Sequence, residues 1–297
     1  MTELGNQPIL VAVANPDHVE QLVRTAGDLA HLLDTSVQIV SVTVKPHGTP
    51  FSMYADETII ETFSGETRAM LEAATTVAPD DVSVDHHVLV GHSVADGVLK
   101  AIASTDARAL VIGWDDQRTR TEGLLGTNLD RLIKRAPCDL YVERIGYEAD
   151  GVDSVLLPVA GGPHVRTATL AAKAIAVRND ATVHVLSVAE SDSDSDAARD
   201  DIESATQLLE TVPGPNARIA TLHRTGENVS DAIVETAPDH DVIVFGTTRH
   251  GAIRRRLVGS IPRTVIQRTD RTVVLSRSSS VVGKTGIGTV GRLWDQS

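Results

Sequence analysis

The sequence predicts an α/β protein built from two tandem domains, each with a parallel sheet covered by helices on both faces. Two observations support this class. Apolar runs suited to strands alternate with amphipathic helical patterns along the 297 residues, which is the pattern of βαβ units. In addition, residues 109–145 resemble residues 242–277. A repeat of this length indicates two copies of one domain rather than a solenoid.

The first half reads as five strands separated by helices. After an apolar strand at 9–13, Asn15 can cap a helix and Pro16 suits its first turn. Apolar residues from Val19 to Leu33 then recur at spacings of three and four, which indicates one buried helix face. The other elements expected are strands at 36–44, 82–90, 109–112 and 139–144, and helices at 58–78, 94–104 and around 129–133.

The second half repeats this order. Strands are expected at 155–159, 181–188, 218–224, 241–245 and 272–276, and helices at 163–178, 198–211, 228–236 and 261–268. We therefore expect domains at 1–149 and 150–280, followed by a tail at 281–297. Apolar residues in the tail, including Leu293 and Trp294, indicate either packing across a domain or a docking segment.

Both copies carry the same loop between their last two strands. A strand ends at Gly113 or Gly246, and the next helix starts at a small pair, Gly126-Thr127 or Gly259-Ser260. Parallel sheets bind ligands beyond the carboxyl ends of their strands, and the amides of a helix N-terminus can hold a phosphate. Helix capping explains the small pairs equally simply. Capping is favoured in the first copy, and phosphate contact stays open in the second.

Composition and charge exclude several classes. The single cysteine, Cys138, excludes an internal disulfide framework and fits a reducing cytoplasm. The net charge of −13 disfavours nucleic acid as a partner, because such binding needs positive charge. We see no apolar stretch long enough to span a membrane and no signal peptide, so a cytoplasmic location is expected.

The balance of charged residues indicates a halophilic protein. Acidic residues number 40, and the 27 basic residues are mostly arginine, with very few lysines. Molar salt screens the self-repulsion of such a surface. The alternative is an acidic protein from a GC-rich genome, which also favours arginine.

No metal site is predicted. His86, His87 and His92 lie on or after one strand without a carboxylate or cysteine partner at ligand spacing. The acidic stretch 191–196 has part of the spacing of a calcium loop, but Ala197 stands where the loop needs glycine. A solvated acidic loop explains it better.

The strand–loop–Gly-[Ser/Thr]–helix pattern resembles the universal stress protein family, whose motif is G-x2-G-x9-G-[ST]. Gly246, Gly259 and Ser260 match three of its four fixed positions, while Arg249 replaces the second glycine and Gly251 follows closely. The duplication, the order of five strands and the last strand with its APCDLYV sequence extend the resemblance over 8–145 and 154–277.

The resemblance implies that each half is a Rossmann-like (HUP-type) domain with a five-stranded parallel sheet of order 3-2-1-4-5. It also implies an intrachain pseudo-dimer in which the last strands meet, as in family dimers, and a homodimer is a further expectation. Many members bind ATP. The chain is similar to archaeal tandem domains found as cytosolic tails of amino-acid permeases, so a transporter or another protein is an expected partner.

In the second half, the resemblance places an adenine nucleotide such as ATP or AMP on one group of residues. These are Val159, Ala160, Gly161, Val188, Gly246, Arg249, His250, Gly251, Gly259, Ser260 and Ile261. Arginines at 254–256 add positive charge that would attract a phosphate. Ala160, however, stands where ATP-binding members usually carry Asp, so we expect weak affinity.

The first half is the poorer candidate. Gly113, Gly126 and Thr127 match the same motif positions, but Asp115 and Asp116 in the loop would repel a phosphate. We therefore expect at most one nucleotide per chain, in the second half.

Two classes of function remain open. The first is a non-enzymatic stress-response or regulatory module, and the second is an enzyme that hydrolyses or transfers nucleotides on the same fold. No arrangement of a nucleophile with a base is evident in the sequence, which favours the first class.

Overall fold

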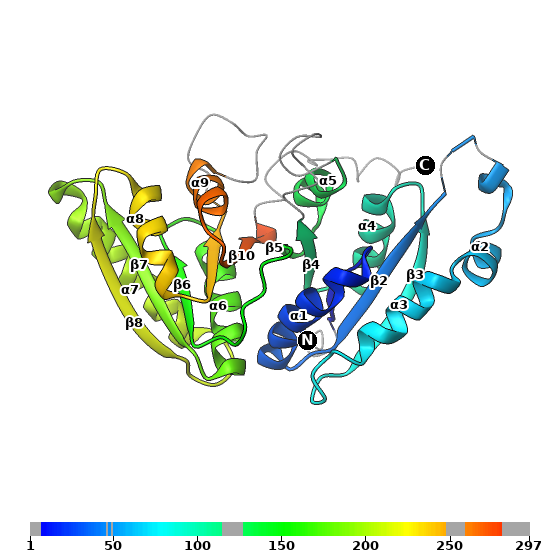
Figure 1. Cartoon of the computed structure of the whole chain (residues 1–297), viewed down its shortest axis with the longest axis horizontal. Helices are drawn as coiled ribbons and strands as arrows, with labels where there is room; N and C mark the ends of the chain where they lie inside the picture. Colours follow the sequence, from blue (N-terminus) through cyan, green and yellow to red (C-terminus); the bar gives the residue numbers. More distant parts are fainter. Residues whose placement is uncertain (1–6, 46, 49, 115–126, 248–258, 281–297) are drawn as a thin grey trace, which may run out of the picture.

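Ten strands form one continuous sheet in the computed structural model, which describes residues 7–45, 47–48, 50–114, 127–247 and 259–280. The strand order is β3-β2-β1-β4-β5-β10-β9-β6-β7-β8, so the first half of the chain builds one side of the sheet and the second half builds the other (Figure 1). Among the described residues, no helix is long and apolar enough to cross a membrane.

The elements of the first half follow the predicted order. The strands are β1 (Ile9–Ala12), β2 (Val37–Val44), β3 (Val84–Gly91), β4 (Ala109–Trp114) and β5 (Asp139–Arg144). The helices are the 3-10 turns Pro16–His18 and Pro50–Met53, followed in chain order by α1 (Val19–Leu33), α2 (Asp56–Phe63), α3 (Gly65–Thr75), α4 (Val94–Thr105) and α5 (Thr127–Arg135).

The second half repeats this arrangement. Its strands are β6 (Ser154–Pro158), β7 (Thr182–Ala189), β8 (Arg218–Thr225), β9 (Val242–Gly246) and β10 (Thr272–Arg277). Its helices are α6 (Val165–Asn179), α7 (Ser195–Thr211), α8 (Val229–Thr236) and α9 (Ser260–Arg268), with 3-10 turns at Asp192–Asp194 and Ala237–Asp239.

Two local expectations need correction. The single helix expected at 58–78 is two helices, because the chain leaves helical geometry at Ser64, where φ is −112° and ψ is 19°. Asn15 does accept a hydrogen bond, from the backbone N of Asp17, but it caps the 3-10 turn that precedes α1 rather than α1 itself.

Within each half the strands have the expected order 3-2-1-4-5, but the two halves form one ten-stranded sheet and not a five-stranded sheet each. Pairing within each half is parallel, whereas β10 pairs with β5 antiparallel. Leu275 lies opposite Val142, and Ser276 lies opposite Tyr141. The last strands therefore meet as expected, and this pairing hides two edges that would otherwise be open to association.

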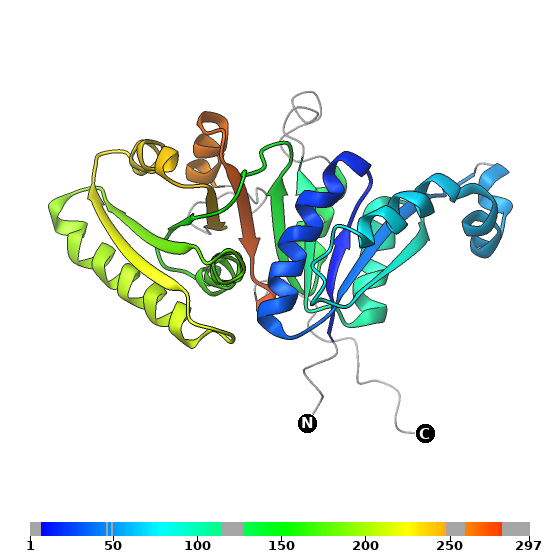
Figure 2. The ribbon, with the colours of Figure 1, turned by 60° about the horizontal axis from the view of Figure 1, so that its bottom comes forward.

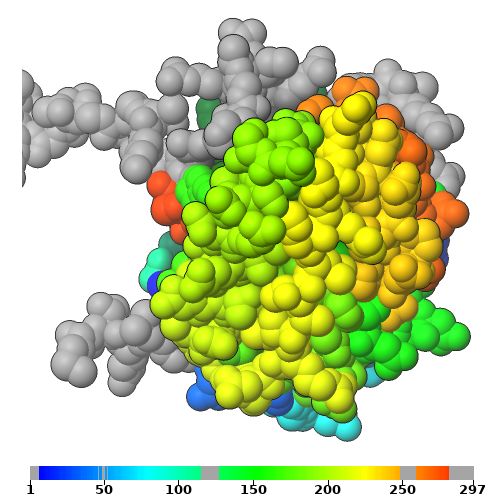
Figure 3. All heavy atoms as spheres, turned by 90° about the vertical axis from the view of Figure 1, so that its left-hand side faces the viewer, coloured from blue at the N-terminus to red at the C-terminus, as the bar shows by residue number. Residues whose placement is uncertain are grey.

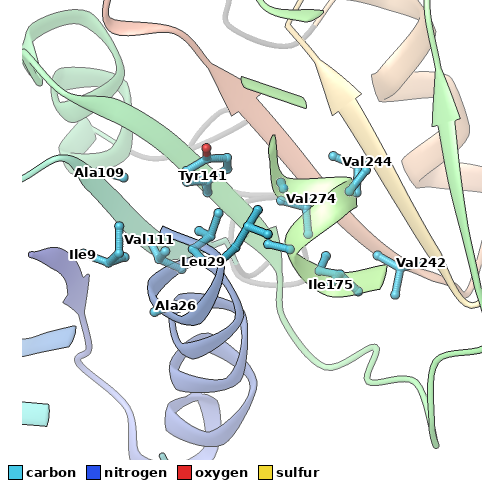
Figure 4. Packing of buried hydrophobic residues seen from close by; sticks show 14 of the residues in the cluster. Ile9, Ala26, Leu29, Ala109, Val111, Tyr141, Ile175, Val242, Val244 and Val274 are labelled. Atoms are coloured by element: carbon cyan, nitrogen blue, oxygen red, sulfur yellow. The ribbon is translucent and has the colours of Figure 1, made fainter. Parts of the chain in front are cut away.

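Helices cover both faces of the sheet. One apolar cluster packs α1, α3, α6 and α7 against one face, and a second packs α4, α5, α8 and α9 against the other. The first cluster runs without interruption from one half to the other: Leu29 and Tyr141 of the first half lie close to Ile175 and Val274 of the second (Figure 4). The halves therefore share a core as well as a sheet.

Helices α1 and α6 lie side by side over the central strands (Figure 2). Polar contacts join the halves beside them, since Arg178 of α6 donates to Asp81 at 2.8 Å and His31 of α1 contacts the same carboxylate at 2.7 Å. These contacts lower the pKa of Asp81 to about 2, with the Arg178 hydrogen bond as the largest cause.

Candidate functional site

A cavity of about 110 Å³ lies in the second half, at the carboxyl ends of β6 and β9. These two strands are neighbours, and the chain leaves β6 to form β7 on its other side. The strand order therefore reverses between β6 and β9, and ligands of open α/β sheets bind at such a point.

The walls of the cavity are mostly apolar. The residues come from the end of β6 and the loop after it, from α6, β7 and α8, from the end of β9 with Thr247 after it, and from the start of α9. They are Pro158, Val159, Ala160, Gly161, His164, Val165, Ala168, Leu186, Val188, Val229, Ile233, Phe245, Gly246, Thr247, Ile261 and Pro262. Apolar walls with a few polar groups are typical of pockets for small organic ligands.

His164 and Gly246 determine the shape of one wall. The His164 side chain is 5% exposed, and its Nδ1 accepts a hydrogen bond from the backbone N of Ser278 at 3.0 Å. A methyl group built on Gly246 would lie 3.2 Å from the carbonyl oxygen of His164. Because the two backbones approach this closely, a side chain at position 246 would crowd this wall.

The N-terminus of α9 borders the cavity. Gly259 is the N-cap residue and has no side chain that could cap the helix, and Ser260 is the first helical residue. Ile261 and Pro262 line the cavity itself, whereas the Ser260 side chain is exposed. A helix N-terminus concentrates partial positive charge, so this side of the cavity favours an anionic group.

The loop after β6 forms the mouth of the cavity. Val159 is buried, Ala160 is exposed, and Gly161 has a φ of +65°, which few side chains tolerate. A methyl group built on Gly161 would lie 3.1 Å from Oδ1 of Asp201, which comes from α7. Burial and the neighbouring Asp200 raise the pKa of Asp201. A carboxyl group therefore does reach this loop, although Ala160 has none.

The same place in the first half is crowded by side chains. Leu22 of α1 occupies the position that corresponds to Ala168 of α6. A methyl group built on Gly113 would lie 2.7 Å from Cδ1 of Ile145 and 3.3 Å from Cδ1 of Leu22. The space at the ends of the first and fourth strands therefore differs between the two halves. The loop charges likewise favour the second half over the first as a place for a phosphate.

The structure brings together some of the predicted site residues. Val159, Ala160, Gly161, Val188, Gly246 and Ile261 line the cavity, and Gly259 and Ser260 lie at its edge on α9. Arg249, His250 and Gly251 fall outside the described residues, as does Gly126. In the first half, Gly113 lies within β4, and Thr127 is the first residue of α5 with an exposed side chain.

Sequence reasoning missed several lining residues. Phe245, Val229 and Ile233 read simply as core positions of a strand and a helix, and His164 carries no motif. The sequence does contain one signal of the cavity, which is the small Ala168 where the first half has Leu22. This signal can be interpreted only once the structure shows that this helix position faces the cavity. Among the described residues, no group of three or more His, Cys, Asp or Glu side chains could hold a metal ion.

Fold and cavity together describe a tandem α/β protein with an apolar cavity where the strand order of its second half reverses. The universal stress protein family model matches residues 5–144 and 151–277. The chain therefore belongs to the universal stress protein family. A search of curated proteins found no match.

Solved structures share the whole tandem fold. A universal stress protein from Archaeoglobus fulgidus is 16% identical with a TM-score of 0.61, covering 91% of this chain and 98% of that one. The cytoplasmic domain of a prokaryotic cation chloride cotransporter is 12% identical with a TM-score of 0.60, covering 93% and 97%. A functionally unknown protein from Pseudomonas aeruginosa is 16% identical with a TM-score of 0.59, covering 93% and 94%.

Proposed function

We propose that this protein is a non-enzymatic regulatory module of the cytoplasm that binds one adenine nucleotide in its second half. The observation that carries the proposal is the cavity at the junction of β6 and β9, open beside Ala168 and bordered by the N-terminus of α9. Its apolar walls suit a base, and the amides at the start of α9 suit a phosphate.

Each residue group has a role in this proposal. Val159, Gly161 and Val188 would contact the base and ribose, with Ala160 at the mouth. Gly246 would permit close approach of the backbone. The residues assigned to the phosphates are Gly259, Ser260 and Ile261 at the helix start, with Arg249, His250 and Gly251 from the preceding loop. The two functional units would divide near residue 150, with 281–297 as a tail.

The geometry favours binding over catalysis. His164 is the histidine in the cavity wall, and its Nδ1 already accepts from Ser278, so that atom is occupied as a base. Isothermal titration with ATP, ADP and AMP tests the proposal. A single site per chain supports it, whereas two equivalent sites or a site confined to the first half would contradict it.

A second candidate is a regulatory partner of a membrane transporter that needs no nucleotide. The observation in its favour is that the whole tandem fold recurs in the cytoplasmic domain of a cation chloride cotransporter. If no nucleotide binds in titrations at low and high KCl, this candidate becomes the better one.

A further inference from the structure

Three large apolar side chains lie exposed within one short segment of the described chain, residues 53–63. Among the described residues, the exposed large apolar side chains are Val44 at the end of β2, Met53, Tyr54 and Phe63 before α3, and Val77 after α3. Met53 is 88% exposed, Phe63 52% and Tyr54 48%. The other large apolar residues in the described part of the chain are at least partly buried, so Met53, Tyr54 and Phe63 mark one surface.

An aromatic cluster forms the centre of this surface. The ring centroids of Phe51 and Phe63 are 5.3 Å apart, those of Tyr54 and Phe63 are 5.7 Å apart, and those of Phe51 and Tyr54 are 6.3 Å apart. The chain has only 3 Phe and 3 Tyr. Half of these aromatic residues therefore lie together at the surface, in a mutual arrangement that holds their rings in place.

The segment that carries the cluster is an addition to the repeated fold. In the second half, β7 leads to α7 through residues 190–194 alone, whereas in the first half residues 45–64 separate β2 from α3. Helix α2 lies at the outer end of the first half (Figures 1 and 2). The outer end of the second half, formed mainly by the segments from α7 through α8, is rounded (Figure 3).

The added segment is anchored rather than loose. Ile59 of α2 is fully buried, and Lys45 donates to the carbonyl oxygen of Tyr54 at 2.6 Å and to Oδ1 of Asp56 at 3.0 Å. The hydroxyl of Ser64 donates to the carbonyl oxygen of Ile59 at 3.3 Å. Ile59 thus anchors α2 to the core, while Phe63 of the same helix and Met53 and Tyr54 before it stay exposed.

Charge around the cluster selects the kind of partner. Asp56, Glu57, Glu61 and Glu66 are exposed on α2 and at the start of α3. Of the neighbouring basic side chains, Lys45 is paired with Asp56, and Arg68 donates to the carbonyl oxygen of Ile60 at 3.2 Å. An acidic rim repels anionic lipid and repels the same rim of a second copy of this chain. It attracts a segment that combines apolar side chains with Lys or Arg.

We infer that Met53, Tyr54 and Phe63 form a docking surface for an apolar segment of another protein flanked by basic residues. The aromatic rings and Met53 would take its apolar side chains, since flexible Met and rigid aromatic residues suit such contacts. Glu57 and Glu61 would pair with its basic residues. This inference is independent of nucleotide binding.

The probe is a fluorescein-labelled, 14-residue helical peptide of Leu and Lys, and fluorescence anisotropy measures its binding. The measurement is made at about 0.15 M NaCl, where surface charges still act over about 8 Å. The variant M53S/Y54S/F63S removes apolar surface without changing charge. We expect it to weaken binding at least tenfold. Val77→Ser is the matched control, because Val77 is exposed beyond the far end of α3.

Further measurements complete the test. Glu57→Gln with Glu61→Gln should also weaken binding, and a Leu–Glu peptide should not bind. Equal binding by the triple variant would overturn the inference. So would dimers, or binding to phosphatidylglycerol vesicles, that disappear in the triple variant. Tighter peptide binding after deletion of residues 281–297 would identify the chain's own tail as the occupant and would overturn it as well.

Discussion

Arg144 and Arg277 make equivalent hydrogen bonds across the junction of the two halves, each to a carbonyl oxygen of the other half. Each is the last residue of its half's last strand, and each is 4% exposed. Arg144 donates from Nη1 to the carbonyl oxygen of Thr269 at 2.6 Å, and Arg277 donates from Nη2 to that of Ala136 at 2.8 Å. Thr269 and Ala136 hold corresponding places directly after α9 and α5, so each arginine binds the helix end of the other half.

Replacing either arginine with Ala should destabilise the protein. Each substitution leaves a buried carbonyl oxygen without its donor, which costs about 1–3 kcal/mol per group. Each variant also loses a second contact, because Arg277 donates to the carbonyl oxygen of Cys138 at 3.0 Å and the Arg144 guanidinium lies 3.5 Å from the centroid of the Tyr147 ring. Urea unfolding measures the loss of stability. Arg199→Ala is the control, since its ion pair with Asp196 is exposed. An equal loss of stability in that variant would show that the buried hydrogen bonds of Arg144 and Arg277 do not stabilise the junction.

Glu143 should make the protein less stable as the pH rises. This carboxyl is buried in the junction and accepts from Gln21 Nε2 at 2.9 Å and Thr25 Oγ1 at 2.7 Å. Burial, the largest cause, raises its pKa from 4.5 to about 7. Because the folded protein holds this proton more tightly than the unfolded chain, stability falls as pH rises from 4.5 through about 7.

Glu143→Gln should remove most of that dependence. We expect the variant to match the wild type near pH 4 and to be more stable by up to about 3 kcal/mol near pH 8, measured by thermal unfolding. Some dependence of stability on pH should remain because of Asp28, whose pKa is also raised by burial. Arg178 and Arg24 oppose that rise in pKa, whereas Glu143 and Asp81 add to it. Parallel stability–pH curves for the two proteins would show that Glu143 does not titrate in this range.

Ala168→Leu should abolish nucleotide binding by filling the cavity. The substitution copies the side chain that Leu22 presents at the corresponding place in the first half. We expect titration heat with ATP to disappear while the thermal unfolding temperature stays the same or rises. Leu22→Ala is the control: it should cost about 2–5 kcal/mol of stability through the cavity it creates and leave ATP affinity unchanged. Intact binding by Ala168→Leu would place the nucleotide elsewhere.

Lys173→Met should destabilise the second half. Lys173 is fully buried, and its Nζ donates to the carbonyl oxygens of Leu209 at 2.9 Å and Val212 at 2.7 Å. It therefore satisfies carbonyl groups at the end of α7, and losing it should cost about 1–3 kcal/mol in urea unfolding. Lys100→Met on the exposed face of α4 should leave the free energy of unfolding almost unchanged. A similar loss of stability in that variant would argue against a specific role of the Lys173 hydrogen bonds.

Salt should stabilise the whole protein. With 40 acidic and 27 basic residues, the surface repels itself unless ions screen it. We expect the unfolding temperature to rise between about 0.1 M and about 3 M KCl, where the Debye length falls from about 10 Å to below 3 Å. An unchanged temperature over this range would contradict adaptation to high salt.

Local patterns were enough to predict the alternation of strands and helices. Spacings of three and four between Val19 and Leu33 correspond to α1, and the β-rich runs correspond to the ten strands. Such signals depend on neighbours in the chain, so the sequence contains them directly. The duplication is likewise visible in the residues themselves. The break at Ser64 was missed, because helical propensity on both sides of it hides the change of direction.

Only the tertiary structure decided how the halves combine and where the cavity of the second half lies. The bonds from Arg144 to Thr269 and from Gln21 to Glu143 join residues more than a hundred positions apart, and no local pattern specifies such pairs. In the same way, Ala168 and Leu22 are both ordinary apolar residues of a helix. Packing against the ends of neighbouring strands leaves a cavity beside one of them and crowds the space beside the other.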